Sequence, residues 1–319
     1  MPNEEWKRKL RADPIPWLLE GEASIRYFAL TEVLDRSDDD PEAVAAKKAI
    51  PGSPTVKAIV AAQHPEGYWE QADSTYWPKY KSTLWQLTIL SELGVGGDHP
   101  AVRKGLAQME KAIEAIGAPK AIIEEGDVIY CYSGNTIRYL CHFGRGENAE
   151  VRRALDRLLE LIKKDGAWTC PHNDGATCIW GLIKVLRGLA ALPPSLRSKG
   201  TEETIKKGAE TLLEFDYLGQ PKEGLTENGW ETDWLKFGFP SFYESDLLEA
   251  LDTLTDLGYG EDLRLRRLLD PVLSKQDELG RWRLENSFNG RMQMDIEVKG
   301  EPSRWITLRA LRTLKKAYP

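Results

Sequence analysis

The chain has 319 residues, about the length of two average domains, although α-helical barrels and toroids of this size are often single units. Its 43 Lys and Arg residues against 50 Asp and Glu residues give a net charge of −7. This balance argues against a nucleic-acid or anionic-membrane partner, since both need a basic face. Hydrophobic residues make up 41% of the chain, enough for a large core.

Targeting signals are lacking in the N-terminal residues 1–17, which contain no apolar signal-peptide core, and no apolar run approaches the roughly 20 residues of a membrane span. We therefore expect a soluble, cytoplasmic protein without an integral membrane segment. Thiols in such a chain are expected to be reduced rather than joined in a disulfide framework. The four cysteines are Cys131, Cys141, Cys170 and Cys178.

Amphipathic helices are predicted along most of the chain. The clearest is 149–164, where Val151, Leu155, Leu158 and Ile162 recur at steps of three and four and form one apolar stripe. Comparable patterns predict helices at 42–49, 55–63, 82–93, 99–113, 134–143, 176–191, 202–214, 242–256, 261–275 and 303–317. Period-two alternation is almost absent, so the expected fold class is all-α.

A repeat signature punctuates these helices. Four segments, QHPEGYW, KKDGAWTC, TENGW and KQDELGRW, each end a helix with a Gly and then a Trp. The tryptophans are Trp69, Trp168, Trp230 and Trp282. Their spacing indicates a unit of about 50 to 60 residues, with one repeat in the first gap that has lost its Trp. A strongly apolar helix follows each motif.

A helical hairpin cannot bury its apolar side alone, so successive hairpins must stack into a solenoid or close into a ring. Helices with charges on one face suit an outer ring, and the more apolar ones suit an inner ring. No linker interrupts the series. We therefore expect one α/α-toroid domain over 1–319, a closed ring of about six hairpins with 1–54 as the atypical first one.

The Q-x-x-x-G-x-W motif and the inner helix after it resemble the repeat of squalene and hopene cyclases and of protein prenyltransferase β subunits. The similarity covers about 55–319. The strings PKYKSTLWQL, CYSGN, WTC…TCIWGLIK, FGFPSFY and GRMQMDIEVKGEPSRWITL resemble a group of prokaryotic stand-alone toroid proteins of the prenyltransferase or squalene-cyclase-like type. The resemblance implies an α/α toroid that acts on a hydrophobic, isoprenoid-like small molecule.

The sequence also departs from these relatives. Class II cyclases carry a D-x-D-D motif on an inner helix, whereas this sequence has none: the run Asp38 to Asp40 has another spacing and lies near the N-terminus. Protein prenyltransferases hold zinc with Asp, Cys and His, but Asp127 and Cys131 do not have that spacing. The sequence therefore predicts neither the class II cyclase reaction nor the protein prenyltransferase reaction for this chain.

Chemistry is expected at one end of the ring, which we call the mouth, where all loops from outer to inner helices would lie. Two thiols, an imidazole and a carboxylate fall between residues 170 and 178, and a further thiol belongs to the adjacent repeat. The candidate catalytic residues are Cys131, Cys170, His172, Asp174 and Cys178. Cys131, Cys170, His172 and Cys178 could form a zinc site, since zinc prefers thiolate and imidazole ligands.

Two other interpretations of the cysteines remain open. His172 or Asp174 could hold a thiol in the protonation state for acid/base or nucleophilic chemistry, in which case a thiol of lowered pKa is expected. An α/α barrel enzyme thought to use cysteines in its cavity, linalool dehydratase-isomerase, is similar in this respect. Alternatively the cysteines are small buried hydrophobes, as we expect for Cys141.

Aromatic and cationic side chains at the mouth are candidates for binding substrate. Tryptophans near inner helices could steady a carbocation or stack on a flat ring, or could belong to the core between helices. Cations near the inner helices could hold a diphosphate or carboxylate, or could be solvated caps. They are Lys79, Lys81, Arg138, Lys184, Arg291 and Arg304. The candidate substrate-binding residues are Tyr80, Trp85, Asn135, Trp180, Trp234, Tyr243, Arg291 and Trp305.

Three functions follow from these features. The first is an enzyme of the terpenoid cyclase and prenyltransferase-like superfamily whose Cys/His/Asp cluster acts on an isoprenoid-like molecule in a central cavity. The second is a carbohydrate-active toroid with paired carboxylates, for example Asp174 and Asp233. The third is a non-catalytic lipid-binding or scaffold toroid.

Overall fold

The fold of the described residues is mostly helical, as the sequence predicts. The computed structural model describes residues 4–114, 129–170, 175–219 and 233–319. The predicted residues His172, Asp174 and Trp230 lie outside these ranges. Within them the regular β-structure is one two-stranded antiparallel pair, β1 (Trp282–Arg283) with β2 (Pro302–Ser303).

The N-terminal region is built from short helical pieces. It comprises the 3₁₀ turn η1 (Glu5–Lys9), α1 (Ile15–Leu19), α2 (Ala23–Phe28), the π-helical turn η2 (Ala29–Val33), α3 (Pro41–Ala49) and the 3₁₀ turn η3 (Ile50–Gly52). Asp40 caps α3 by accepting hydrogen bonds from the backbone N–H groups of Glu42 and Ala43. α2 and η2 follow each other without a break and form one helical stretch.

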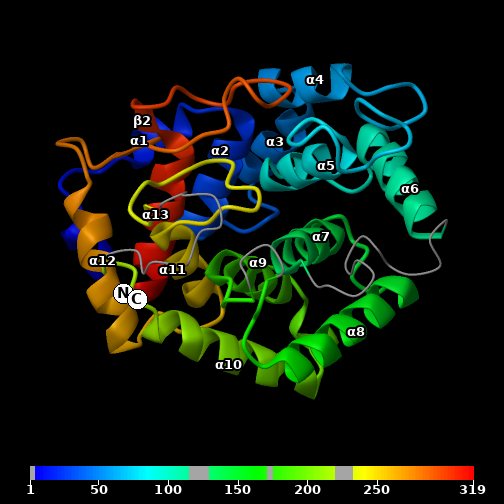
Figure 1. Ribbon diagram of the computed structural model, residues 1–319. Helices are drawn as coiled ribbons and strands as arrows, with labels where there is room; N and C mark the ends of the chain where they lie inside the picture. Colours follow the sequence, from blue (N-terminus) through cyan, green and yellow to red (C-terminus); the bar gives the residue numbers. More distant parts are fainter. Residues whose placement is uncertain (1–3, 115–128, 171–174, 220–232) are drawn as a thin grey trace.

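Longer helices follow in alternation, and Figure 1 shows them as a peripheral set and an inner set. The peripheral helices are α4 (Pro54–Ala61), α6 (Pro100–Glu114), α8 (Ala149–Asp165), α10 (Lys199–Glu214) and α12 (Leu263–Ser274). The inner helices are α5 (Thr83–Glu92), α7 (Tyr130–His142), α9 (Ile179–Ala190), α11 (Leu247–Asp256) and α13 (Arg304–Ala317). A 3₁₀ turn, η5 (Pro194–Leu196), precedes α10.

The predicted helix ends agree with these bounds to within a few residues, apart from the start of α11. The sequence pattern places that start at 242, but the helix begins at Leu247. Asp246 is the reason, because its carboxylate accepts hydrogen bonds from the N–H groups of Glu249 and Gly238 at 2.8 and 2.9 Å. The apolar run before Asp246 is a loop that packs into the core.

Each inner helix packs against the next one. α5 contacts α7, α7 contacts α9, α9 contacts α11 and α11 contacts α13. The tightest of these pairings is between α7 and α9, where a Cβ at Gly134 would clash with the Lys184 carbonyl and one at Gly188 would lie 2.7 Å from the Gly134 oxygen. Small residues thus allow the two backbones to approach closely.

The C-terminal helix returns to the N-terminal pieces. α13 contacts η1, α2 and η2, and the Lys9 ammonium at the end of η1 lies 4.8 Å from the ring centroid of Tyr318, just after α13. Gln276, just after α12, also contacts the N-terminal region, since its Oε1 accepts from the Arg11 N–H at 3.0 Å and its Nε2 donates to the Lys9 carbonyl at 3.1 Å. At the other side of α2, Ser24 donates to the Leu93 carbonyl, just after α5.

The repeated Trp has the same structural role in the first and last repeats. The indole N–H of Trp69 donates to the Ile59 carbonyl at 2.8 Å, and that of Trp282 donates to the Val272 carbonyl at 2.7 Å. In both cases the acceptor lies ten residues earlier, in the peripheral helix. Both side chains are fully buried, and Trp168 is nearly so. These residues join the peripheral helix to the turn that precedes the inner helix.

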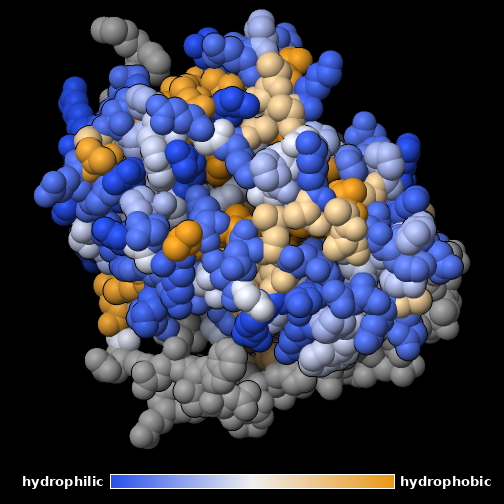
Figure 2. Space-filling model, turned by 90° about the horizontal axis from the view of Figure 1, so that it is seen from above, coloured by the Kyte–Doolittle hydropathy of each residue, from blue (hydrophilic) through white to orange (hydrophobic). Residues whose placement is uncertain are grey.

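The surface mixes hydrophilic residues with small apolar groups, as Figure 2 shows for one face. Such a mixture is usual for a folded protein. Among the described residues, no helix has the length and apolar character needed to cross a membrane.

Candidate functional site

Residues at the starts of the inner helices converge, as the sequence predicts for the mouth. Tyr80 precedes α5 and Tyr243 precedes α11, yet their hydroxyl oxygens lie 2.7 Å apart in a hydrogen bond. Burial and this contact raise the pKa of Tyr80 far above its usual value. The two tyrosines are therefore neutral hydrogen-bonding groups.

An aromatic cluster surrounds this tyrosine pair. Its rings lie with centroids 4.5 to 6.4 Å apart, a spacing at which aromatic pairs attract each other. The members come from six segments of the chain. They are Tyr76, Tyr80, Trp85, Tyr132, Trp180, Phe242, Tyr243 and Phe288.

Besides Tyr80 and Tyr243, four predicted binding residues belong to the aromatic cluster or contact it. Trp85 is buried and its indole N–H donates to the Tyr76 carbonyl at 2.8 Å. Trp180 is half-buried, and its indole N–H has no acceptor within the described part of the chain. Asn135 donates to the Phe242 carbonyl at 2.7 Å, and the Arg291 guanidinium lies 4.5 Å from the Tyr80 ring centroid.

Two predicted binding residues lie apart from the cluster. Trp234 packs edge-on against Phe215 and Tyr217 near the end of α10. Trp305 stacks on Phe239 with 4.3 Å between ring centroids and an interplanar angle of 6°. For these two tryptophans, packing between helices explains the position.

The thiol cluster, which consists of Cys131, Cys170 and Cys178, lies beside the aromatic cluster. Cys131 is in the first turn of α7 and Cys178 caps α9, where its sulfur accepts from the Gly181 N–H at 3.3 Å. The thiols of Cys170 and Cys178 are hydrogen-bonded to each other, and Cys131 is close enough to act electrostatically on both and on Tyr243. The predicted gathering of these three residues is therefore present.

The protonation of these thiols differs from the expectation of an activated thiolate. Burial raises the pKa of Cys131 to about 11, and contact with Cys170 together with burial raises the pKa of Cys178 well above its usual value. Both residues are thus neutral thiols at neutral pH, and the expected lowering of the pKa is wrong for them. Among the described residues no group of three or more His, Cys, Asp or Glu side chains is arranged to hold a metal. The zinc set also includes His172, which the structure does not describe.

The position of Asp233 does not support the carboxylate pair expected for a carbohydrate-active toroid. Asp233 accepts a hydrogen bond from the Leu235 N–H and lies 3.1 Å from the Lys236 ammonium in an exposed ion pair. Asp174, the other member, lies outside the described residues.

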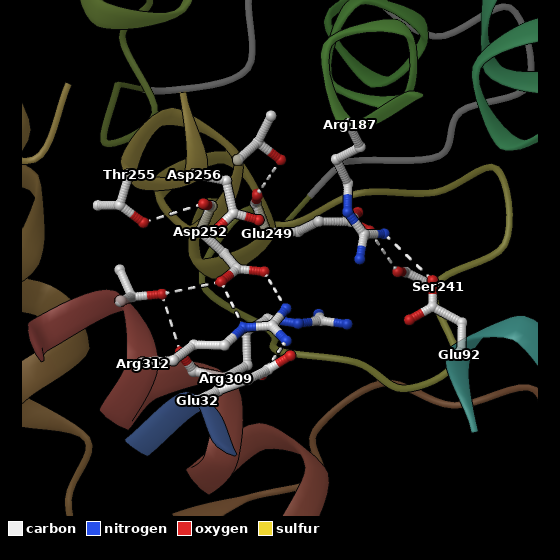
Figure 3. A network of polar contacts seen from close by, with 12 residues as sticks. Glu32, Glu92, Arg187, Ser241, Glu249, Asp252, Thr255, Asp256, Arg309 and Arg312 are labelled. Atoms are coloured by element: carbon white, nitrogen blue, oxygen red, sulfur yellow. Dashed lines mark hydrogen bonds and ion pairs between the residues drawn. The ribbon is translucent and has the colours of Figure 1, made fainter. Parts of the chain in front are cut away.

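A second cluster, which the sequence analysis missed, joins charged side chains of the inner helices below the aromatic cluster, from the first turn of α11 to the last residue of α5 (Figure 3). We call it the charge network. Lys184 donates to both carboxylate oxygens of Glu249 at 2.8 and 2.7 Å, and Ser241 donates to Glu249 as well. Arg187 joins this pair to Glu92, which also binds Arg138. Its members are Glu32, Glu92, Arg138, Lys184, Arg187, Ser241, Glu249, Asp252, Arg309 and Arg312.

The same network extends to the C-terminal helix. Arg312 donates to Asp252 at 2.6 Å and to Glu32 of η2 at 2.9 Å, so one guanidinium ties α11 to the N-terminal region. Arg309 is 4% exposed and its Nη1 makes one long contact, 3.4 Å, with the Gly238 carbonyl. Figure 3 shows its guanidinium beside that of Arg312.

Burial and charge oppose each other in this network. Burial favours the neutral acid, but Arg138 and Arg187 lower the pKa of Glu92 to about 2. Lys184 and Arg187 likewise hold the pKa of Glu249 far below its usual value, against the effect of burial. Burial lowers the pKa of Lys184 to about 8 despite the nearby Glu249. The carboxylates therefore stay ionised, each balanced by a cation.

A sequence signal for this network exists. In three inner helices, two like charges stand three residues apart inside an otherwise apolar run: Lys184 and Arg187, Glu249 and Asp252, Arg309 and Arg312. A spacing of three places both charges on one helix face. The acidic helix α11 lies between the two basic ones, so the three pairs complement one another.

Comparison with known proteins gives no assignment. No family model matches the chain, and no curated protein sequence matches it.

Proposed function

We propose that the chain is a single closed α/α toroid of about six hairpins that binds a hydrophobic small molecule at the aromatic cluster. Ring closure is supported by the succession of inner-helix contacts from α5 to α13 and by the contacts of α13 with α2 and η2. In a ring of this kind the aromatic cluster occupies the mouth, and the charge network lies behind it among the inner helices.

The observation that carries the binding proposal is the convergence of aromatic side chains from six segments beside the thiol cluster. Aromatic faces favour apolar and flat ligands and stabilise positive charge. Tyr243 is half-buried, and the indole N–H of Trp180 has no acceptor among the described residues. A ligand hydroxyl could accept that hydrogen bond.

The ligand class that suits these groups is an isoprenoid-like molecule with one polar end. An enzyme of the terpenoid cyclase and prenyltransferase-like class would use the cluster to stabilise positive charge and the neighbouring neutral thiols as proton donors. The same site without chemistry would make the protein a lipid carrier.

Farnesol titration followed by tryptophan fluorescence tests the binding proposal. The test variant is Trp180→Phe and its matched control is Trp234→Phe, because both side chains are half-buried and only the first lies in the aromatic cluster. We expect binding to wild type and control, with an affinity on the order of tenfold weaker for Trp180→Phe. Absence of binding to wild type, or an equal loss in both variants, would overturn the proposal.

Catalysis is tested separately. Wild type is incubated with farnesol and with farnesyl diphosphate, and the extracts are analysed by gas chromatography and mass spectrometry. New hydrocarbon or alcohol products that are lost in Cys131→Ala support an enzyme. Unchanged ligand that is recovered bound to the protein supports the carrier.

A further inference from the structure

Cys170 and Cys178 lie on the two arms of a short antiparallel hairpin. Thr169 and Thr177 form a β-bridge, the Cys178 N–H donates to the Trp168 carbonyl at 2.9 Å, and the Cys170 N–H donates to the Ala176 carbonyl at 3.2 Å. Alternate side chains of paired strands share a face, so residues 170 and 178 are diagonal neighbours on one side. Their thiols are in hydrogen-bond contact.

We propose that Cys170 and Cys178 form a reversible disulfide. The two sulfur atoms are in contact and must approach to the bonded distance of about 2.05 Å. The paired backbone holds the two residues on one face, and the two arms move closer as the bond forms, since diagonal neighbours lie about 7–8 Å apart and a disulfide spans about 4.4–6.8 Å between Cα atoms.

The chemistry is thiol–disulfide exchange with a small-molecule disulfide such as glutathione disulfide. One cysteine loses its proton and attacks a glutathione sulfur, which gives a mixed disulfide and releases one glutathione. The second cysteine then loses its proton, attacks the protein sulfur of the mixed disulfide and releases the second glutathione. Two protein thiols are oxidised, and one glutathione disulfide is reduced to two thiols.

The other cysteines are less well placed for this reaction. Cys131 is near both residues but belongs to α7, whereas Cys170 and Cys178 lie on the two arms of one hairpin. Cys141 lies in the last turn of α7, at the other end of that helix. The structure therefore assigns the disulfide to one pair among the four cysteines.

The disulfide would act on the mouth through the start of α9. Cys178 is the N-cap of this helix, and its sulfur accepts from the Gly181 N–H. Bond formation with Cys170 turns that sulfur toward the hairpin and weakens the cap, while Trp180 follows two residues later in the aromatic cluster. We expect oxidation to change the affinity for a hydrophobic ligand, and this part alone rests on the proposed function.

The test uses the full-length protein and glutathione disulfide at pH 8.5, where the high pKa of Cys178 slows exchange less than at neutral pH. The products are alkylated, digested and mapped by mass spectrometry. We expect a peptide pair that joins Cys170 to Cys178, two remaining alkylated cysteines, and full reversal by dithiothreitol. Cys131→Ser and Cys141→Ser are the matched controls and should still form this pair.

Variants Cys170→Ser and Cys178→Ser should instead stop at a mixed disulfide with glutathione, with the melting temperature used to show that they remain folded. A dominant bond that includes Cys131, a stable glutathione adduct on either residue of the wild type, or no oxidation of the folded protein would overturn the proposal.

Farnesol titrations of the oxidised and the reduced protein measure the effect of the disulfide on ligand affinity. A change of threefold or more in affinity that is absent in Cys170→Ser supports control of the mouth, and equal affinities refute it. If the disulfide forms but neither form binds farnesol, the modification site stands and the proposed function fails.

Discussion

Lys184 of α9 and Glu249 of α11 form an ion pair that is closed to solvent. The ammonium lies 2.8 and 2.7 Å from the two carboxylate oxygens, and the side chains are 1% and 0% exposed. Because Arg187 and Ser241 also bind Glu249, this carboxylate is the point where several elements meet.

Replacement of Glu249 by Leu leaves Lys184 without its carboxylate, and we expect a loss of about 3–5 kcal/mol in the free energy of unfolding. The double variant Lys184→Met with Glu249→Leu should lose less than the sum of the single variants, since the stranded ammonium is gone. Urea unfolding followed by far-UV circular dichroism measures both. The control is Glu210→Ala at the exposed Arg264 pair, for which we expect a loss below about 1 kcal/mol. Additive losses in the double variant would contradict this prediction.

Acid should destabilise the protein through Glu92. Burial favours its neutral form, but Arg138 and Arg187 prevail and the pKa falls to about 2 in the folded state, below the usual 4.5. A folded pKa below the unfolded one gives stability that is complete above pH 4.5 and is lost as the pH falls toward 2. The shift corresponds to about 3 kcal/mol.

Unfolding free energies of wild type and Glu92→Gln between pH 6 and 3 test this effect. Asp246 acts in the opposite direction, because burial raises its pKa to about 6, so the comparison with the variant is more informative than the wild-type curve alone. We expect a flatter pH dependence below pH 4.5 for Glu92→Gln. Parallel curves would show that Glu92 is not held ionised by its arginines.

The sequence predicts the helices well because their apolar stripes are long and regular, as in Ala149–Asp165. It also predicts the role of Trp69 and Trp282, because a repeated motif must occupy a repeated environment. The convergence of Tyr80, Tyr243 and the cysteines follows from the order of outer and inner helices. These conclusions depend on local pattern and chain connectivity.

The charge network was missed because a charged residue on a helix usually faces solvent, so the sequence alone indicates ligand-binding cations or solvated caps at Arg138 and Lys184 rather than partners of buried carboxylates. Its partners lie about 60 residues away in the next inner helix, as in the Asp252 to Arg312 pair. The raised pKa values of the thiols could not be predicted either, since the pKa of Cys131 depends on how deeply the start of α7 is buried.

Trp69 and Trp282 should be stabilising residues of the first and last repeats. Replacement of either by Ala removes a fully buried side chain and its hydrogen bond to the peripheral helix, and we expect a loss of roughly 3–5 kcal/mol. Trp77→Ala is the matched control, because that side chain is 57% exposed and should cost less than about 0.5 kcal/mol. Thermal unfolding measures all three variants. A melting temperature unchanged in both repeat variants would show that the motif is not structural.

Asn135 should position the aromatic cluster through a buried hydrogen bond. Its side chain is 6% exposed and donates to the Phe242 carbonyl at 2.7 Å, while the Phe242 ring contacts Tyr80 and Trp85 with centroids 5.1 and 5.3 Å away. Asn135→Ala leaves that carbonyl without its donor, which costs about 1–3 kcal/mol, and releases the ring.

We expect the Asn135→Ala variant to lose stability in urea and to show weaker near-UV circular dichroism from the aromatic cluster. The matched control is Asn289→Ala, which removes a similar amide hydrogen bond, to the Glu297 carbonyl at 2.8 Å, in a part-buried loop. That control should lose less stability and keep its near-UV spectrum, because no residue of the aromatic cluster accepts its hydrogen bond. Equal spectral changes in both variants would mean that the hydrogen bond of Asn135 has no special part in holding Phe242 against Tyr80.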